Sequence, residues 1–489
     1  MASAGAELWQ VFKVYWSLLL GNIVEWYEFA VYGHLAVYLE KHFFQGSAVG
    51  VWLGFSLTFL ARPLGGILLG WVGDRYGRSV AVNISIIGML VGTCGQGCLP
   101  TLDCGIPWLG YLGLVLLVCL RFLQGLSAAG EIVTITTYLA EVSSPAILSR
   151  GAALVNITGA CGFLSAKFMS YLVEAIFGVD GVEAWAWRLP FIAAIVPGVI
   201  AIIGRRGIPE SGMFLAAQAK DQEVAHEKVF AKVKHALQYW PNMLVTFGVV
   251  ATYGVLQYGC FVWIHSFLAG QGTSPNDRMV VGMITRCLQI VLGLPIGWLS
   301  DLVGIGWLMT ISSALVMVLG LPLWCVIAAH PTNLMAISMA FGVGFGLLGA
   351  LTGTLLYHFV VELFPTEVRT TSIGLAYNIG FSLFGGLAPV ETTLLYKAHW
   401  MGPGFLYSFA GFVGLVSMLA SRYWQDSLNI PFVREAPYFG AMCVPARKAP
   451  AARELKQLQQ RKKLGNISDD DKMDMTENPS ESDSNATMV

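Results

Sequence analysis

Eight ionisable side chains stand inside long apolar stretches of this chain of 489 residues. Four are acids and four are bases: Glu25, Glu28, Arg62, Arg121, Glu131, Lys167, Arg286 and Glu391. A charge inside a hydrocarbon layer is costly unless it is paired or faces a water-filled cavity, so each one is a functional hypothesis by default. The equal numbers suggest pairing across a helix bundle, although the sequence alone assigns no partners.

Glu25 and Glu28 are three residues apart, so on a helix they share one face. Two carboxyl groups this close repel each other when both are ionised. One of them therefore tends to bind a proton, which it can later release. That is the chemistry of a proton-coupled carrier. If Arg62 lies nearby, a carboxylate that exchanges its arginine for a proton forms a two-state element. The alternative is a permanent Glu–Arg pair that only ties two helices together.

Lys167, Arg286 and Glu391 are weaker candidates. Either base could receive a substrate carboxylate, for which the forked guanidinium of Arg286 fits better, or could extend its charge toward water at the membrane surface. Aromatic side chains beside the charges could surround a quaternary ammonium or could simply pack; they are Trp26, Tyr27, Tyr32, Tyr253, Tyr258 and Trp263.

The composition predicts an integral membrane protein. Hydrophobic residues make up 55% of the chain and charged residues 12%, against roughly 25% charged in soluble proteins. A formal net charge of −1 gives no field that would recruit nucleic acid. Glu25 and Glu28 interrupt the first apolar stretch, so we expect it to be a retained helix rather than a cleaved signal.

Stretches of about 20 mostly apolar residues predict twelve membrane-spanning helices. Their approximate ranges are 15–39, 50–72, 80–100, 107–137, 151–176, 187–204, 241–268, 279–300, 304–328, 333–361, 370–395 and 402–423. Lysines and arginines gather in the connections on one side, which is the cytoplasmic side by the positive-inside rule. With an even number of spans, both termini are then cytoplasmic.

The chain is expected to form two bundles of six helices. A charged loop at 205–240 separates residues 1–204 from residues 241–423. The halves repeat features: residues 70–74 and 297–301 both end a helix with a Gly-rich segment and an aspartate. Parallel repeats of this kind predict a transporter with its substrate site near the midplane. Coincidence among Gly-rich loops is the alternative.

Residues 424–489 are predicted to be a cytoplasmic tail, largely disordered. Its basic part, 447–463, could contact anionic lipid or could be a solvated segment without function.

Several segments carry a family resemblance. Residues 70–78, GWVGDRYGR, resemble the loop signature of the major facilitator superfamily, and residues 121–125, RFLQG, resemble its second signature. Residues 21–33, GNIVEWYEFAVYG, are similar to the opening of the metabolite:proton symporters, which include the proline/glycine-betaine permease and carriers of citrate, 2-oxoglutarate and shikimate. Further blocks match in order at 59–66, 124–131, 187–191 and 362–369.

The resemblance implies roles for two groups of residues. The proton and substrate group is Glu25, Glu28, Arg62, Glu131, Lys167, Arg286 and Glu391. The cytoplasmic gate and coupling group is Gly70, Asp74, Arg75, Gly77, Arg78, Arg121, Glu141, Arg150, Asp301, Glu362 and Arg369. The loop at 301–306 lacks the basic residues of the family signature, so we expect a weaker gate in the second half. No long C-terminal coiled coil is evident, so osmosensing is not carried over.

We therefore expect a proton-coupled secondary transporter of the plasma membrane, not an enzyme, which imports a small polar metabolite by alternating access. Neither a cofactor nor a metal is expected, and no phosphate-cradling loop points to ATP. The expected partners are the substrate, protons and the lipid bilayer. A proton-independent facilitator and a transporter-like sensor are the alternatives. The aromatic residues favour a zwitterionic osmolyte as substrate, whereas Arg286 and Lys167 favour an organic acid.

Overall fold

The computed structural model describes residues 2–76, 78–143, 147–205, 229–364 and 369–427. Within these ranges all regular secondary structure is helical, which confirms the predicted all-α class. The tail after residue 427, including 447–463, lies outside the described residues, as does 206–228 of the predicted loop.

Residues 2–205, here called the N-terminal half, contain ten helical elements. They are α1 (Ala2–His34), α2 (Ala36–Phe44), α3 (Ala48–Tyr76), α4 (Arg78–Gly97), α5 (Pro107–Ala128), α6 (Glu131–Val142), α7 (Leu148–Ala184), η1 (Ala186–Arg188), α8 (Leu189–Ala193) and α9 (Ile195–Arg205).

Residues 229–427, the C-terminal half, continue with α11 (Val229–Leu237), α12 (Trp240–Gly254), η3 (Val255–Cys260), α13 (Trp263–Gly270), α14 (Pro275–Val303), α15 (Ile305–Ala329), α16 (Leu334–Ile337), η4 (Ser338–Phe345), α17 (Gly346–Glu362), α18 (Arg369–Gly380), η5 (Phe381–Gly386), α19 (Ala388–Ala398) and α20 (Gly402–Ser427). The elements η3, η4 and η5 are π-helical turns inside longer helices. Such turns are frequent at functional sites.

Eleven helical segments among the described residues are long and apolar enough to cross a membrane. They coincide with the predicted spans from the second to the twelfth. Large apolar side chains such as Val115, Met335 and Phe409 are exposed on the outside, as a lipid-facing surface requires. The first predicted span lies in α1, which is kinked at Tyr15; the part after the kink, residues 16–34, measures about 29 Å. It stays a prediction that α1 crosses the membrane, which would bring the number of spans to twelve. The cytoplasmic location of both termini also stays a prediction.

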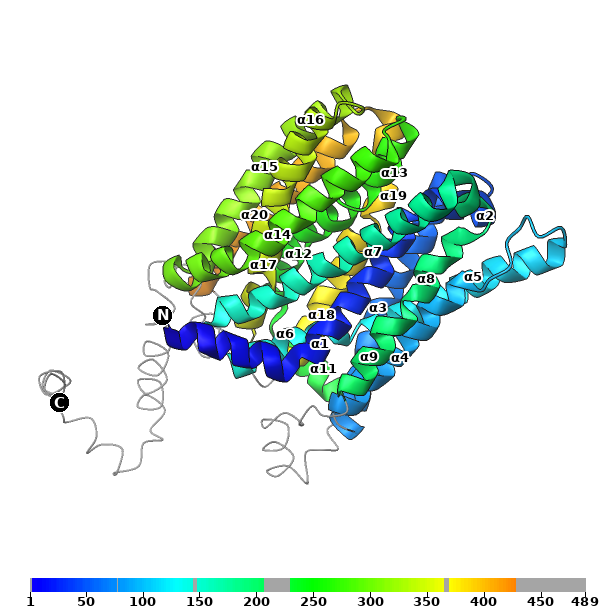
Figure 1. The fold of residues 1–489 in the computed structure, drawn as a ribbon. Coiled ribbons are helices and arrows are strands. Elements are labelled where there is room, and N and C mark those ends of the chain that lie inside the picture. Colours follow the sequence, from blue (N-terminus) through cyan, green and yellow to red (C-terminus); the bar gives the residue numbers. More distant parts are fainter. Residues whose placement is uncertain (1, 77, 144–146, 206–228, 365–368, 428–489) are drawn as a thin grey trace, which may run out of the picture.

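The two halves meet along α7 and α14, which cross side by side between them (Figure 1). A Cβ at Gly297 would lie 3.1 Å from Arg150 Cα, and one at Gly282 would lie 3.5 Å from Lys167 Cε. Numbers fall along α14 as they rise along α7, so the helices are antiparallel. The glycines of α14 allow this close approach, and the register places the middle of each helix opposite the other.

A second contact between the halves joins α3 to α18 and η5. Ser56 Oγ donates to Gly386 O at 2.6 Å, and Asn378 Nδ2 donates to Ala129 O at 3.1 Å. These contacts fix the helices around a buried interface between the halves. The division into two six-helix bundles stays a prediction.

Candidate functional site

Glu25 of α1 and Arg62 of α3 form an ion pair, with Arg62 Nη2 at 2.9 Å from Glu25 Oε1. Both side chains are at most 1% exposed. The Arg62 guanidinium also lies over the rings of Phe29 and Phe59, at 4.8 and 5.0 Å from their centroids. Glu25 Oε2 and two Arg62 nitrogens make no hydrogen bond in the described part of the chain. Removing either partner would leave an uncompensated buried charge.

Glu28, one turn further along α1, is held by neutral side chains. Gln124 Nε2 donates to Glu28 Oε2 at 3.2 Å and to Thr93 Oγ1 at 2.9 Å. Gln124 Oε1 in turn accepts from Arg121 Nη1 at 2.8 Å. The Arg121 guanidinium lies 4.0 Å from the centroid of the Tyr32 ring. The structure therefore joins Glu28 to Arg121 through an amide.

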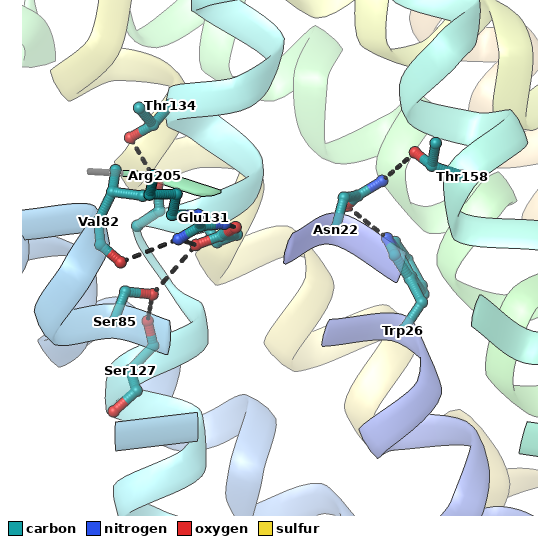
Figure 2. Close-up of polar contacts among 10 residues, drawn as sticks. Asn22, Trp26, Val82, Ser85, Ser127, Glu131, Thr134, Thr158 and Arg205 are labelled. Atoms are coloured by element: carbon teal, nitrogen blue, oxygen red, sulfur yellow. Dashed lines mark hydrogen bonds and ion pairs between the residues drawn. The ribbon is translucent and has the colours of Figure 1, made fainter. Parts of the chain in front are cut away.

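The carboxylate of Glu131 is paired with Arg205. Arg205, the last residue of α9, donates from Nη1 to Glu131 Oε2 at 3.1 Å and to Val82 O at 3.0 Å, and its Nη2 contacts Glu131 Oε1 (Figure 2). The pair lies against Gly21 of α1, where a Cβ would overlap Arg205 Nη2. Gly21 is one turn before Glu25, so three ionisable acids and two of their bases gather along one stretch of α1.

An aromatic cluster, defined as Trp26, Phe59, Phe163 and Tyr258, fills the interface between the halves. Tyr258 comes from η3 of the C-terminal half; its ring stacks on Trp26 at 6.2 Å and meets Phe59 at 4.7 Å. Trp26 meets Phe163 at 5.6 Å. Asn22 orients Trp26 by accepting from its Nε1 at 3.0 Å (Figure 2). The cluster thus offers ring faces next to the Glu25–Arg62 pair.

Arg286 reaches the same cluster from α14. Its guanidinium lies 4.0 Å from the Phe163 centroid and 4.9 Å from that of Phe261. Nη1 donates to Gln289 Oε1 at 2.8 Å and to Gln257 Oε1 at 3.3 Å. The aromatic cluster is therefore flanked by Arg62 with its carboxylate on one side and by Arg286 with neutral partners on the other.

Lys167 and Glu391 have different surroundings. Lys167 Nζ is 3.4 Å from His265 Nδ1, and the His265 ring lies 5.0 Å from that of His34. Glu391, in the first turn of α19, is half-buried and makes no side-chain hydrogen bond or ion pair among the described residues. The structure brings Lys167 to the interface between the halves but assigns Glu391 no partner there.

The polar atoms of the remaining aromatic candidates form hydrogen bonds within the protein. Tyr27 donates to Pro190 O at 2.7 Å, Tyr32 to Val51 O at 2.9 Å, and Trp263 to Thr393 Oγ1 at 2.8 Å. Tyr253 donates to Asn156 Oδ1 at 3.3 Å across the halves. Of the six predicted candidates, Trp26 and Tyr258 belong to the aromatic cluster.

Arg150 and Asp301 close one end of the interface, here called the gate end. Arg150 Nε lies 2.9 Å from Asp301 Oδ2, and Ser149 N donates to Asp301 Oδ1 at 2.8 Å. Ser149 Oγ also lies 3.1 Å from Ser300 Oγ and 2.7 Å from His358 Nδ1 of α17. Although the 301–306 loop lacks bases, Asp301 uses a base of the other half.

Of the other predicted gate residues, some lie at the gate end, and the positions of the rest are not described by the structure. Glu362 Oε1 is 3.7 Å from His358 Nε2, and Arg369 Nε donates to Phe364 O at 3.2 Å. Gly77 lies outside the described residues. The helices of five others are described but their side-chain positions are not: Gly70, Asp74, Arg75, Arg78 and Glu141.

Several partners in these networks were not predicted from the sequence. Arg205 looked like a loop charge, and Gln124 was quoted only as part of a family motif. Gln289 follows Arg286 by three residues, as Gln124 follows Arg121, and in both pairs the arginine donates to the glutamine at 2.8 Å. This repeated spacing was the available signal.

Known transporters resemble this chain in sequence. Residues 14–246 match the family model described as "Sugar (and other) transporter". The chain is 29% identical over 439 residues to the ectoine/proline transporter ProP of Corynebacterium glutamicum, covering 86% of this chain and 85% of that protein. It is 28% identical over 431 residues to the proline/betaine transporter of Escherichia coli K12, covering 86% and 84%.

Among solved structures, the proton:xylose symporter XylE bound to 6-bromo-6-deoxy-D-glucose superimposes with a TM-score of 0.65 at 18% identity, over 85% of this chain and 95% of that one. A partially occluded inward-open XylE from E. coli gives a TM-score of 0.64 at 16% identity, over 86% and 98%. These likenesses show the fold.

The chain resembles the transporters of the major facilitator superfamily, which are not enzymes, and is a multi-pass integral membrane protein. The plasma membrane is the location that the similarity to these transporters indicates. The chain is similar to the proline/betaine permeases, which confirms the resemblance seen in its motifs.

Proposed function

We propose that the protein is a proton-coupled symporter that imports a small zwitterionic osmolyte, such as proline or glycine betaine, by alternating access. The observation that carries the proposal is the contrast between the two glutamates of α1. Glu25 has a cationic partner, whereas Glu28 is held by the neutral amide of Gln124. A buried carboxyl beside a neutral donor can take up a proton without leaving a cation unpaired.

The same contrast divides the roles. Protonation of Glu25 would release Arg62, which is the kind of change that moves one helix relative to another. Glu28 is connected to Arg121 through Gln124, so a change in its charge reaches a second arginine. We assign proton uptake to Glu28 and conformational switching to the Glu25–Arg62 pair.

The zwitterionic substrate is supported by the relatives and by the aromatic cluster. The relatives are transporters of proline, betaine and ectoine by their names. Trp26 and Tyr258 stack on each other here; once the two rings separate, their faces would suit a quaternary or secondary ammonium group, because the face of an aromatic ring attracts cations.

Alternating access is supported by polar contacts at two levels of the interface. At the gate end, Arg150 meets Asp301; further along α7, Lys167 meets His265 of α13. A carrier with its site between the halves must break one set while the other holds. Polar contacts can separate and form again without exposing a large apolar surface.

A proton-independent facilitator of the same substrates is the second candidate, favoured by the completely buried Glu25–Arg62 pair, which could act as a permanent lock. The two are separated by measuring external pH in weakly buffered proteoliposomes. Proline, glycine betaine, citrate, 2-oxoglutarate and shikimate are added in turn. Alkalinisation with proline or betaine, lost in Glu28→Gln, is the expected result. Uptake of radiolabelled proline or betaine with no pH change would overturn proton coupling.

A further inference from the structure

Two buried cations at the interface lack a carboxylate partner. Arg62, Arg205 and Arg150 each pair with an acid, as described above. In contrast, Arg286 contacts two glutamine oxygens and Lys167 contacts a histidine nitrogen, with no ion pair to either among the described residues. Both are less than a tenth exposed. Because an uncompensated buried charge is costly, a missing counter-ion is expected where a ligand supplies it.

The register of α7 and α14 brings these two cations close together. The Arg286 guanidinium lies over Phe163, one turn before Lys167 on α7. Gly282, one turn before Arg286 on α14, faces Lys167 Cε and lies 3.1 Å, measured from an added Cβ, from His265 Cε1. The places along α14 that these two side chains occupy, beside Gly282 and at Arg286, are thus about one helical turn apart. Both side chains are long, so a single carboxylate between α7 and α14 is within the reach of both.

Arg286 has donors free for such a ligand. Its described hydrogen bonds use Nη1 alone, which leaves Nε and Nη2, the edge that a carboxylate binds with two parallel bonds. Glu174, the next acid on α7, is seven residues beyond Lys167 and makes no ion pair with it in the described structure. His34 and His265 add donors but no anion to this region.

We propose that Arg286 and Lys167 form the subsite that binds the carboxylate of the transported substrate, with the substrate's cationic group directed toward the aromatic cluster. The proposal rests on the proposed function and adds the orientation of the substrate in its site. Phe163 contacts both Arg286 and Trp26, so it connects the two subsites. A cation without a carboxylate, such as choline, would be a poor ligand.

The test is substrate counterflow in proteoliposomes, with radiolabelled glycine betaine and proline as probes. Choline and L-prolinamide, which lack the carboxylate, are compared with glycine betaine and proline as competitors. We expect each to inhibit wild type at least about tenfold less than its carboxylate counterpart, the loss that a charged hydrogen bond accounts for. Equal inhibition would overturn the proposal.

Variants locate the effect. Arg286→Gln and Lys167→Gln should each raise the betaine KM about tenfold or more, and Arg286→Lys should raise it less, because it keeps the charge but loses the fork. Lys397→Gln, which removes an exposed cation from the last turn of α19, is the control for loss of a positive charge and should leave KM within about twofold. An unchanged KM in Arg286→Gln, or an equal rise in Lys397→Gln, would overturn the proposal.

Failure here is distinguishable from failure of the proposed function. If citrate, 2-oxoglutarate or shikimate proves to be the transported compound, the osmolyte assignment is wrong, and the Arg286 effect is then measured on that acid, where the same rise in KM supports the subsite. If betaine drives proton uptake but choline competes equally well, the symporter stands and the subsite is wrong.

Discussion

Arg121 and Glu28 are joined through Gln124, which accepts from the arginine at 2.8 Å and donates to the carboxylate at 3.2 Å. All three side chains are buried. The amide lets the two charges influence each other without forming an ion pair. A proton arriving at Glu28 therefore changes the electrostatic surroundings of Arg121 while the hydrogen-bonded chain stays connected.

Replacing the amide should interrupt this connection. Gln124→Leu keeps similar volume but removes the hydrogen bonds to Arg121, Glu28 and Thr93, and we expect proton-driven uptake to fall at least about tenfold, since a buried polar network is left unsatisfied. Gln96→Leu is the matched control, because Gln96 reaches Gln124 through a long contact of 3.4 Å. Initial rates of uptake in proteoliposomes measure the difference; equal losses in both variants would argue against a special role for Gln124.

The Glu25–Arg62 pair should affect stability and transport differently. Arg62→Met leaves Glu25 without its cation, and we expect it to lose about 3–5 kcal/mol of stability. Adding Glu25→Gln removes the orphaned charge and should restore part of the melting temperature without restoring transport. Thermal unfolding in detergent gives the first quantity and uptake gives the second. A double variant that transports at the wild-type rate would show that the pair is not the switch.

Gly21 should tolerate no side chain. An added Cβ overlaps Arg205 Nη2 and would force the Glu131–Arg205 pair apart, so Gly21→Ala should cost about 1–3 kcal/mol, the usual range for overpacking. Gly5→Ala, on the same helix with nothing within 4 Å of the added atom, is the control and should not destabilise the protein. Melting temperatures of the two variants are compared; equal values would contradict the packing seen here.

The gate should depend on charge complementarity between halves. Asp301→Asn removes the negative charge that attracts Arg150 and that accepts the hydrogen bond from Ser149 N. The closed gate end should then be less stable, and the rate of substrate exchange should differ from that of the wild type. Reversing both charges, with Arg150→Asp and Asp301→Arg, should recover part of the wild-type transport rate. If the double variant transports no faster than Arg150→Asp alone or Asp301→Arg alone, the ion pair is not what holds this end closed.

The positions of the helices were easier to predict from the sequence than the pairing of the charged side chains. Apolar length is a local property, so eleven spans appear where they were expected, and the carboxylates of α1 were recognisable because they interrupt an apolar stretch. Which base meets which acid depends on how helices cross. Arg205 therefore looked like a loop charge although it is buried against Glu131, and Glu391, a weaker candidate, has no hydrogen-bonded or ion-pair partner for its side chain among the described residues. The π-helical turn η3, which carries Gln257 and Tyr258, leaves no periodic signature.

The central claim is that Glu28 carries the transported proton, and Glu28→Gln tests it most directly. Two rates are measured in the same proteoliposomes with radiolabelled proline or glycine betaine: accumulation driven by an inward proton gradient, and exchange at equilibrium, which needs no net proton movement. The account predicts that Glu28→Gln abolishes accumulation while exchange stays within about twofold of wild type, because the amide preserves the contact with Gln124. Accumulation by Glu28→Gln at the wild-type level would contradict it.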